Sequence, residues 1–196
     1  MSRCLSAPAS HETLIKRSRF IAHAERCATE QQARDFLKRI SDPTATHNCW
    51  AWRAGDQYRF DDDGEPGGTA GRPILAAIEG QEMDQVAVIV IRHYGGIKLG
   101  TGGLIRAYGG TAAECLRTAI SEPIIETTRL NCQVPFETIA LVHQLLDRHQ
   151  ALKLDEHYSS TGVELSLELP TTNLDAFITD LGNATSGAAE IVKQNT

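Results

Sequence analysis

The sequence lacks long hydrophobic runs and paired cysteine motifs. No stretch approaches the roughly 18 apolar residues of a membrane span, and the opening segment MSRCLSAPAS has no apolar core of the signal-peptide kind. The five cysteines are an odd number at irregular spacing, without a CxxC pair, which predicts reduced thiols rather than disulfides or structural zinc. We therefore expect a cytoplasmic protein with no membrane partner and no cofactor.

Basic residues are scarce in the second half of the chain. The net charge is −6 over 196 residues; through Glu122 there are 15 basic and 15 acidic residues, but from Pro123 onward 4 basic and 10 acidic. Since phosphate contacts dominate nucleic-acid affinity, any RNA contact is expected in the first half. The Ser121-Glu122-Pro123 break predicts two domains, residues 1–122 and 123–196.

A strand, a glycine-rich loop and a helix follow one another in the middle of the chain. The β-branched run Val86 to Ile91 predicts a strand buried on both faces, and we expect Thr101 to cap the next helix. A helix N-terminus after such a loop is suited to anions, although no nucleotide fingerprint is present. The candidate anion- or RNA-binding residues are Arg72, Arg92, His93, Tyr94, Gly95, Gly96, Lys98, Gly100, Thr101, Gly102, Gly103 and Arg106.

An acidic loop precedes this region, within residues 61–73. Two interpretations of its carboxylates remain open. They could bind a hard cation through Asp61, Asp62 and Asp63, or accept backbone N–H bonds and pair with arginines to hold a shaped loop. The second is favoured because the spacing does not match a calcium-binding loop. The acidic-motif candidates are His47, Asp61, Asp62, Asp63 and Glu65.

The remaining patterns predict a mixed α+β protein. Residues 12–15 and 19–25 read as a hairpin, Thr29 and Gln32 as a capping box opening a helix, residues 47–52 as a strand, and Pro73 as the start of another helix. The second half reads β-α-β-β-α-β, which is typical of a ferredoxin-like domain, with Asn173 expected to cap its last helix.

Two interpretations remain open for the aromatic residues Trp50, Trp52 and Tyr94. They form either an exposed docking patch or part of the core.

Three motifs together resemble the IMPACT family, in its bacterial YigZ-like branch. They are His47-Asn48-Cys49-Trp50-Ala51, Asp62-Asp63-Gly64-Glu65-Pro66 with Gly68 to Pro73, and Arg92-His93-Tyr94-Gly95-Gly96 continuing through Leu99 to Tyr108. The resemblance implies a first domain like domain 2 of ribosomal protein S5 and a ferredoxin-like second domain, as in domains IV and V of elongation factor G.

The resemblance implies function only at the level of class. The leading hypothesis is a non-enzymatic, translation-associated regulatory protein whose basic, glycine-rich surface binds RNA, the ribosome or a translation factor. One alternative is a metal-dependent phosphate-ester hydrolase using Asp61 to Asp63. Another is a module that docks a protein partner through its aromatic residues.

Overall fold

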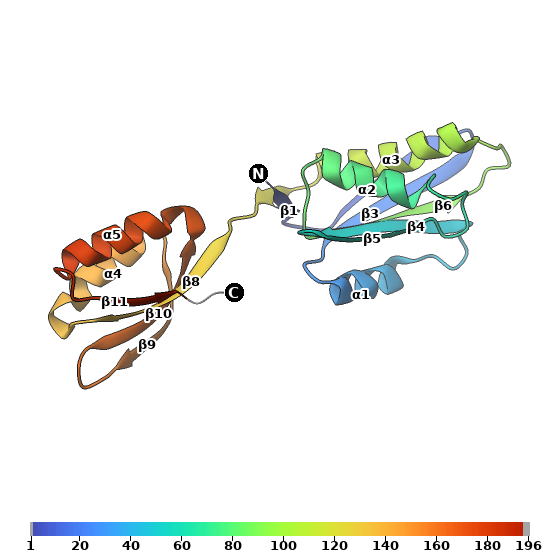
Figure 1. Cartoon of the computed structure of the whole chain (residues 1–196). Helices are drawn as coiled ribbons and strands as arrows, with labels where there is room; N and C mark the ends of the chain where they lie inside the picture. Colours follow the sequence, from blue (N-terminus) through green and yellow to red (C-terminus); the bar gives the residue numbers. More distant parts are fainter. Residues whose placement is uncertain (1, 194–196) are drawn as a thin grey trace. The chain divides into compact units, whose positions relative to one another are not determined.

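The computed structural model describes residues 2–193, which fall into two compact units, Met1–Ile124 and Ile125–Thr196. The first unit is built on a five-stranded antiparallel sheet in the order β2-β3-β6-β4-β5 (Figure 1). The strands are β2 (Ala9–Ile15), β3 (Ser18–Arg26), β4 (His47–Ala54), β5 (Gln57–Asp61) and β6 (Val86–His93). The predicted hairpin and the central position of the β-branched strand are confirmed.

Helices cover both faces of this sheet because β6 is apolar on both of its sides. Val86, Val88 and Val90 face the core formed with α2 (Gly71–Gly80) and α3 (Thr101–Thr118). Ala87, Ile89 and Ile91 pack instead on the side of α1 (Glu30–Ile40). Figure 1 shows α2 and α3 above the sheet and α1 below it. Consecutive residues of β6 therefore point to different helices.

The predicted capping box of α1 is present. Gln32 donates its backbone N–H to Thr29 Oγ1, and the Gln32 side chain accepts the N–H of Thr29 in return. Trp52 belongs to the core cluster between α1 and the sheet, and its side chain is 1% exposed. Its indole N–H donates to the Cys27 carbonyl at 2.9 Å.

Several local predictions are wrong in detail. The helix expected from Pro73 begins at Gly71. The N-cap of α3 is Gly100, with no side-chain cap, so Thr101 is the first helical residue rather than the cap. Asn173 precedes α5 without capping it, because its side-chain amide donates to the His149 carbonyl.

One short sheet escaped prediction. β1 (Arg3–Leu5) pairs antiparallel with β7 (Ser121–Pro123), and the Arg3 guanidinium reaches the side chain and carbonyl of Ser121. The segment read as a break between domains is thus a strand of the first unit. The first unit accordingly continues to Ile124.

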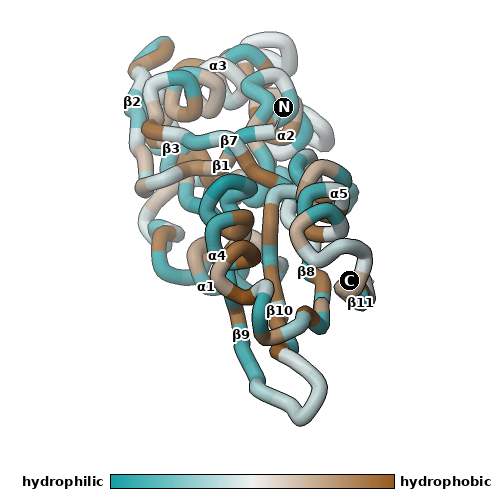
Figure 2. The backbone as a smooth tube through the Cα atoms, turned by 90° about the vertical axis from the view of Figure 1, so that its left-hand side faces the viewer, coloured by the Kyte–Doolittle hydropathy of each residue, from teal (hydrophilic) through white to brown (hydrophobic). Residues whose placement is uncertain are grey.

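The second unit is a four-stranded antiparallel sheet in the order β11-β8-β10-β9 with both helices on one face (Figure 1). Its elements are β8 (Thr127–Val134), the short helix η1 (Phe136–Thr138), α4 (Ile139–Arg148), β9 (Leu152–Tyr158), β10 (Val163–Pro170), η2 (Thr171–Asn173), α5 (Leu174–Ala184) and β11 (Glu190–Lys193). The hydropathy of β8 and β10 alternates along each strand (Figure 2). The β-α-β-β-α-β order predicted for a ferredoxin-like domain is confirmed.

All five cysteines are buried and free of disulfides in this structure. Burial raises the pKa of the Cys115 and Cys132 thiols to about 11, so both stay protonated as small core residues. Within residues 2–193, no helix combines the length and the apolar character needed to cross a membrane.

Candidate functional site

The acidic and glycine-rich motifs meet at one pocket of about 440 Å³ in the first unit. His47 is the first residue of β4, and Arg92 lies next to the last residue of β6. The two are direct cross-strand partners, and both side chains line the pocket. The pocket is lined by Thr46, His47, Glu65, Pro66, Arg92, Tyr94, Lys98, Leu99, Gly100, Thr101 and Leu104. The fold therefore brings the acidic loop and the glycine-rich loop together, which the sequence alone does not show.

A buried polar network forms the inner end of this pocket. Arg92, 5% exposed, donates from Nη1 to Glu65 Oε1 at 2.5 Å, and the Tyr108 hydroxyl donates to the same oxygen at 2.7 Å. Arg92 Nη2 lies 3.5 Å from Ser18 Oγ, and the guanidinium lies over the Phe20 ring. Both charges are therefore held by partners, as buried charges must be.

Tyr108 serves this network as a hydrogen-bond donor. Burial raises the pKa of its hydroxyl far above the usual range, and the neighbouring Cys49 thiol and Glu65 carboxylate raise it further. The hydroxyl consequently keeps its proton and stabilises the ionised Glu65.

His47 is oriented by the acidic loop. Its Nδ1 lies 2.7 Å from the Asp63 carbonyl oxygen, which only accepts, so Nδ1 carries a proton. Nε2 lies 3.8 Å from Glu65 Oε1 in the pocket. In the neutral ring Nε2 is then an acceptor.

The carboxylates of the acidic loop hold the loop itself. Asp62 accepts backbone N–H bonds from Gly68 at 2.7 Å, Ala70 at 2.9 Å and Gly71 at 2.8 Å, the last two at the start of α2. Asp63 accepts the N–H of Asn48. The predicted role of these carboxylates as backbone acceptors is confirmed. Among the described residues, no group of three or more His, Cys, Asp or Glu side chains is placed to hold a metal ion.

We expect Asp62→Asn to destabilise the first unit in a pH-dependent way. Burial alone raises the pKa of Asp62, but the three N–H donors outweigh it and the net pKa lies below the ordinary 3.8. Because the folded-state pKa is depressed, the stabilisation is complete above about pH 4 and disappears as the pH falls through the folded value. Chemical denaturation at pH 7 should show a loss of about 1–3 kcal/mol. A difference between variant and wild type that did not shrink towards pH 2.5 would contradict this.

Within the described residues, the N-terminus of α3 has no carboxylate beside its first N–H groups, whereas the N-terminus of α2 has one; we call the α3 N-terminus open for this reason. Asp62 supplies a carboxylate to the first N–H groups of α2, whereas α3 has neither a side-chain cap nor an acidic residue in its first turn. Gly100 and Thr101, which begin α3, line the pocket together with Lys98. This geometry and partial charge suit an anion.

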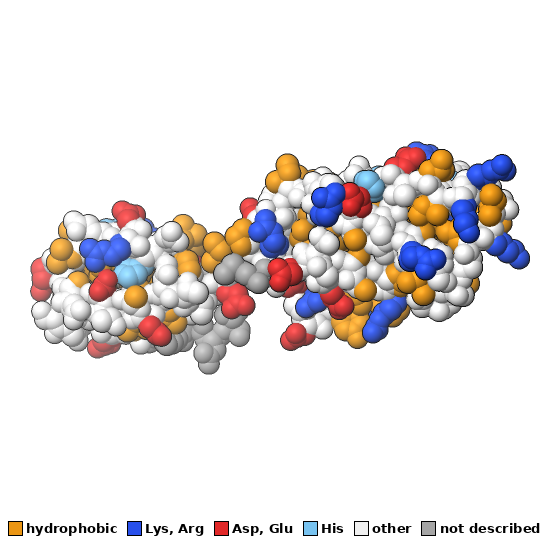
Figure 3. All heavy atoms as spheres, turned by 90° about the horizontal axis from the view of Figure 1, so that it is seen from above, with side chains coloured by type: hydrophobic (Ala, Val, Ile, Leu, Met, Phe, Trp, Pro, Cys, Tyr) orange, Lys and Arg blue, Asp and Glu red, His pale blue; other side chains and the backbone are white. Residues whose placement is uncertain are grey.

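Exposed cations surround this end of the unit. The β2–β3 turn lies very close to the loop between β6 and α3, here called the α3 loop (residues 94–100). A Cβ on Gly95 in this loop would lie 1.9 Å from the Arg17 carbonyl oxygen. Figure 3 shows Lys and Arg side chains gathered at this right-hand end of the first unit. Five exposed basic residues of this region have no carboxylate within salt-bridge distance among the described residues; they are Lys16, Arg17, Arg72, Lys98 and Arg106. Lys38 in α1 and Arg59 in β5 are also exposed and without such a partner in the part of the chain that the structure describes.

Three other candidates differ from expectation: His93 and Asp61 lie apart from the pocket, and Arg92 is buried within it. His93 points to the α1 side of the sheet, where its Nε2 lies 3.5 Å from Asp42 Oδ2. Arg92 lines the pocket, but it is a buried ion-pair partner rather than the exposed RNA contact we expected. Asp61 Oδ1 accepts a hydrogen bond from the Asp63 N–H. Asp61 also lines a different pocket, which lies between α1 and the strands β4 and β5.

The proposed patch of three exposed aromatic residues does not form. Trp52 belongs to the core beside α1, and Trp50 is half-buried against the same cluster. Tyr94, by contrast, is 44% exposed at the pocket on α3's side of the sheet. The one aromatic side chain of the three left for ligands at this pocket is Tyr94.

Sequence reasoning missed three polar contributors, namely Ser18, Thr46 and the hydroxyl of Tyr108. Ser18 Oγ accepts the N–H of Gly95 at 3.2 Å, and Thr46 Oγ1 accepts that of Tyr94 at 2.9 Å. The Tyr108 hydroxyl is not among the candidate binding residues that the sequence indicated. A hydroxyl at a buried helix position was the available signal, because a buried tyrosine requires a hydrogen-bond partner.

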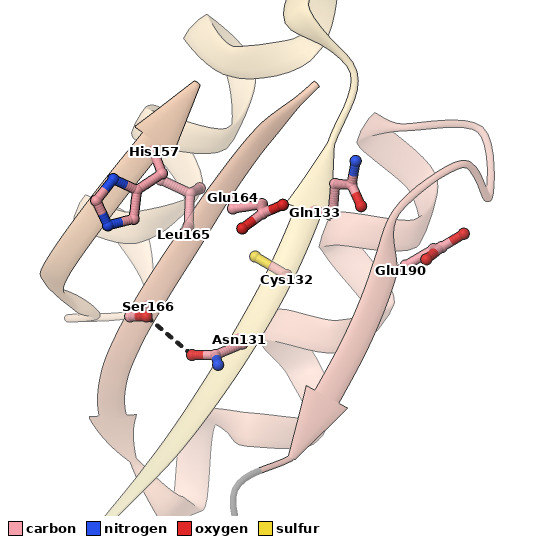
Figure 4. Close-up of a pocket in the computed structure, with 8 residues that line it drawn as sticks. All are labelled: Asn131, Cys132, Gln133, His157, Glu164, Leu165, Ser166 and Glu190. Atoms are coloured by element: carbon pink, nitrogen blue, oxygen red, sulfur yellow. Dashed lines mark hydrogen bonds between the residues drawn. The ribbon is translucent and has the colours of Figure 1, made fainter. Parts of the chain in front are cut away.

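The second unit has a pocket of different chemistry. It lies on the face of the sheet opposite the helices and is lined by side chains of β8, β9, β10 and β11 (Figure 4). Ser166 donates to Asn131 at 2.9 Å, and Glu164 and Glu190 add negative charge. This face is therefore poorly suited to phosphate.

Together these features define a two-domain α+β protein, with an S5 domain 2-like unit that carries the pocket and a ferredoxin-like unit. A family model described as Impact N-terminal domain matches residues 16–116, and one described as a domain of unknown function (DUF1949) matches residues 132–188. The chain belongs to the IMPACT family and is of the bacterial YigZ-like kind.

Relatives match along most of their length. A Thermus thermophilus protein described as an IMPACT family member in pol 5'region is 49% identical over 157 residues, covering 80% of this chain and 87% of the relative. The Escherichia coli IMPACT family member YigZ is 33% identical over 194 residues, 95% of each chain. A crystal structure described as that of an hypothetical protein has a TM-score of 0.71 at 31% identity, covering 99% of this chain and 97% of the other.

Proposed function

We propose that the first domain binds RNA as a non-enzymatic component of translational regulation. The observation that carries this proposal is the coincidence of the open N-terminus of α3 with exposed cations that have no carboxylate partner within residues 2–193. Lys98 and Arg106 flank that N-terminus, and Lys16 and Arg17 lie on the neighbouring β2–β3 turn. Such surfaces attract phosphates through released counterions and helix N–H groups.

The distribution of acidic residues supports the same surface. Several exposed arginines elsewhere in the first domain are paired, as in Arg19 with Glu12, Arg34 with Glu30 and Arg117 with Glu114, although Arg59 is not paired with any described residue. Paired cations contribute little to phosphate binding because their charge is already compensated. The charges of the basic residues around the start of α3 are not compensated in this way.

We expect the double variant Lys98→Glu with Arg106→Glu to lose binding to ribosomes and tRNA. Co-sedimentation across a salt series should show wild-type affinity falling steeply with salt, and each lost phosphate contact should reduce the slope of log affinity against log salt by about 1. Both residues are exposed, so the fold should survive.

Lys38→Glu is the matched control. Lys38 is exposed in the last turn of α1, on the other face of the sheet, and its replacement produces the same change of charge per residue. It should leave the salt dependence unchanged. Binding that did not depend on salt, or that fell equally in control and double variant, would refute the proposal.

A further inference from the structure

The pocket beside α3 has two ends of different chemistry. Its outer end has the open helix N-terminus, Thr101 and the exposed Lys98. Its inner end has Glu65, 8% exposed, with His47 beside it. The outer end attracts an anion, whereas a carboxylate at the inner end opposes one. An anion alone therefore uses only half of the pocket.

The inner end offers hydrogen-bond acceptors. The two hydrogen bonds that Glu65 accepts from the described residues both reach Oε1, which leaves Oε2 as an acceptor. His47 Nε2 is a second acceptor in the neutral ring, because Nδ1 donates to Asp63. Arg92, which also lines the pocket, has a buried Nε without a hydrogen-bond partner among the described residues. Such orphaned groups are rare in folded proteins.

The wall between the two ends is apolar. Leu99, Leu104 and Pro66 line it, and the half-exposed ring of Tyr94 lies at its edge with the Arg92 guanidinium 5.3 Å from the ring centroid. Aromatic side chains in this setting stack with planar groups such as nucleobases. The volume of about 440 Å³ is within the range of small-ligand sites, roughly 300–1,000 Å³.

We infer that this pocket binds one nucleoside 5′-monophosphate unit. The phosphate lies at the start of α3 beside Lys98, and the base lies against Tyr94 and Leu99. Hydroxyl or amino groups of the nucleoside donate to Glu65 and His47. The unit is either a free mononucleotide or the phosphorylated 5′ end of an RNA, and only the second source rests on the proposed function.

Thr101→Glu separates binding from folding. A carboxylate in the first turn of α3 occupies the position of the phosphate and interacts favourably with the helix dipole, so thermal stability should be kept or raised. Lys38→Glu again serves as the charge control, on the opposite face of the sheet.

The test is a calorimetric titration of the full chain with five probes. They are inorganic phosphate, adenosine, adenosine 5′-monophosphate, and one 12-nucleotide RNA with either a 5′-phosphate or a 5′-hydroxyl. We expect the monophosphate to bind at least tenfold more tightly than phosphate or adenosine, and Thr101→Glu to abolish that binding while Lys38→Glu does not.

The RNA pair distinguishes the two sources. At least tenfold tighter binding of the 5′-phosphorylated RNA identifies an RNA end as the ligand, whereas equal RNA binding beside tight monophosphate binding identifies a free nucleotide. Monophosphate binding without any RNA binding supports the pocket and refutes the proposed function. Equal RNA binding with monophosphate no better than phosphate overturns the inference but leaves the proposed function standing. Monophosphate binding that survives Thr101→Glu also overturns it.

Discussion

Arg92→Ala is expected to lower the free energy of unfolding of the first domain by about 3–5 kcal/mol. The substitution leaves the Glu65 carboxylate, whose side chain is 4% exposed, without its cation in a low-dielectric site. Tyr108 still donates to Glu65 but cannot replace a full charge. Urea denaturation followed by the fluorescence of Trp50 and Trp52, both of which lie in the first domain, measures this loss.

Two further variants test the cause. Arg92→Met combined with Glu65→Met removes both charges, and should recover much of the loss because apolar side chains replace the pair. Arg19→Ala breaks an exposed ion pair with Glu12 on the neighbouring hairpin and should change stability little. A double variant as unstable as Arg92→Ala alone would show that the guanidinium acts through packing rather than charge.

Gly95→Ala is expected to destabilise the first domain by about 3 kcal/mol, the upper end of the usual cost of overpacking. An alanine Cβ would lie 1.9 Å from the Arg17 carbonyl oxygen and 2.1 Å from its carbonyl carbon. Both are backbone atoms of the β2–β3 turn, so relief requires the turn or the α3 loop to move. Ser18 would then lose its hydrogen bond from the Gly95 N–H. Thermal and urea denaturation would report the loss.

Gly110→Ala is the matched control for this prediction. Gly110 is exposed within α3, and a Cβ there meets nothing within 4 Å. Alanine in a helix interior is favoured over glycine by roughly 1 kcal/mol, so this variant should be more stable than wild type. If Gly95→Ala and Gly110→Ala had the same effect, the close approach of the two loops would not be the reason for glycine at position 95.

Local patterns predicted much of the fold. The capping box at Thr29, the buried run Val86 to Ile91 and the alternation of Val163, Leu165, Leu167 and Leu169 each depend on residues near in sequence, and each formed the expected element. Periodicity and capping are local physical signals, so they are readable without knowledge of the rest of the chain.

Contacts between distant residues could not be predicted this way. The β1–β7 sheet pairs Arg3 with Pro123, and neither short strand has a periodic pattern of its own. Arg92 shows the same limit at the site. Its charge suggested an exposed contact, but the side chain is buried over the Phe20 ring, and its partner Glu65 lies 27 residues away in the chain. A sequence shows which side chains are charged, but it does not show whether a charged side chain is buried or exposed in the folded protein.

The acidic loop shows how geometry decides between two chemical interpretations. Three successive carboxylates suit either a metal ion or backbone donors, and composition cannot separate these roles. In the folded chain Asp62 accepts N–H bonds from Gly68 in the loop and from Ala70 and Gly71 at the start of α2. Asp61 and Asp63 bond within the loop and to β4. The loop thereby positions Glu65 and His47 at the pocket.

The measurement that tests the account most directly is the mapping of RNA contacts on the isotope-labelled protein. Amide chemical shifts of the 21.4 kDa chain are recorded with and without a short single-stranded RNA. We predict that the changes concentrate at residues 94–106 and at Lys16 and Arg17, and that they vanish in Lys98→Glu with Arg106→Glu. Changes confined to α1 and β5 or to the second domain, or no changes at low salt, would contradict RNA binding at the surface around α3.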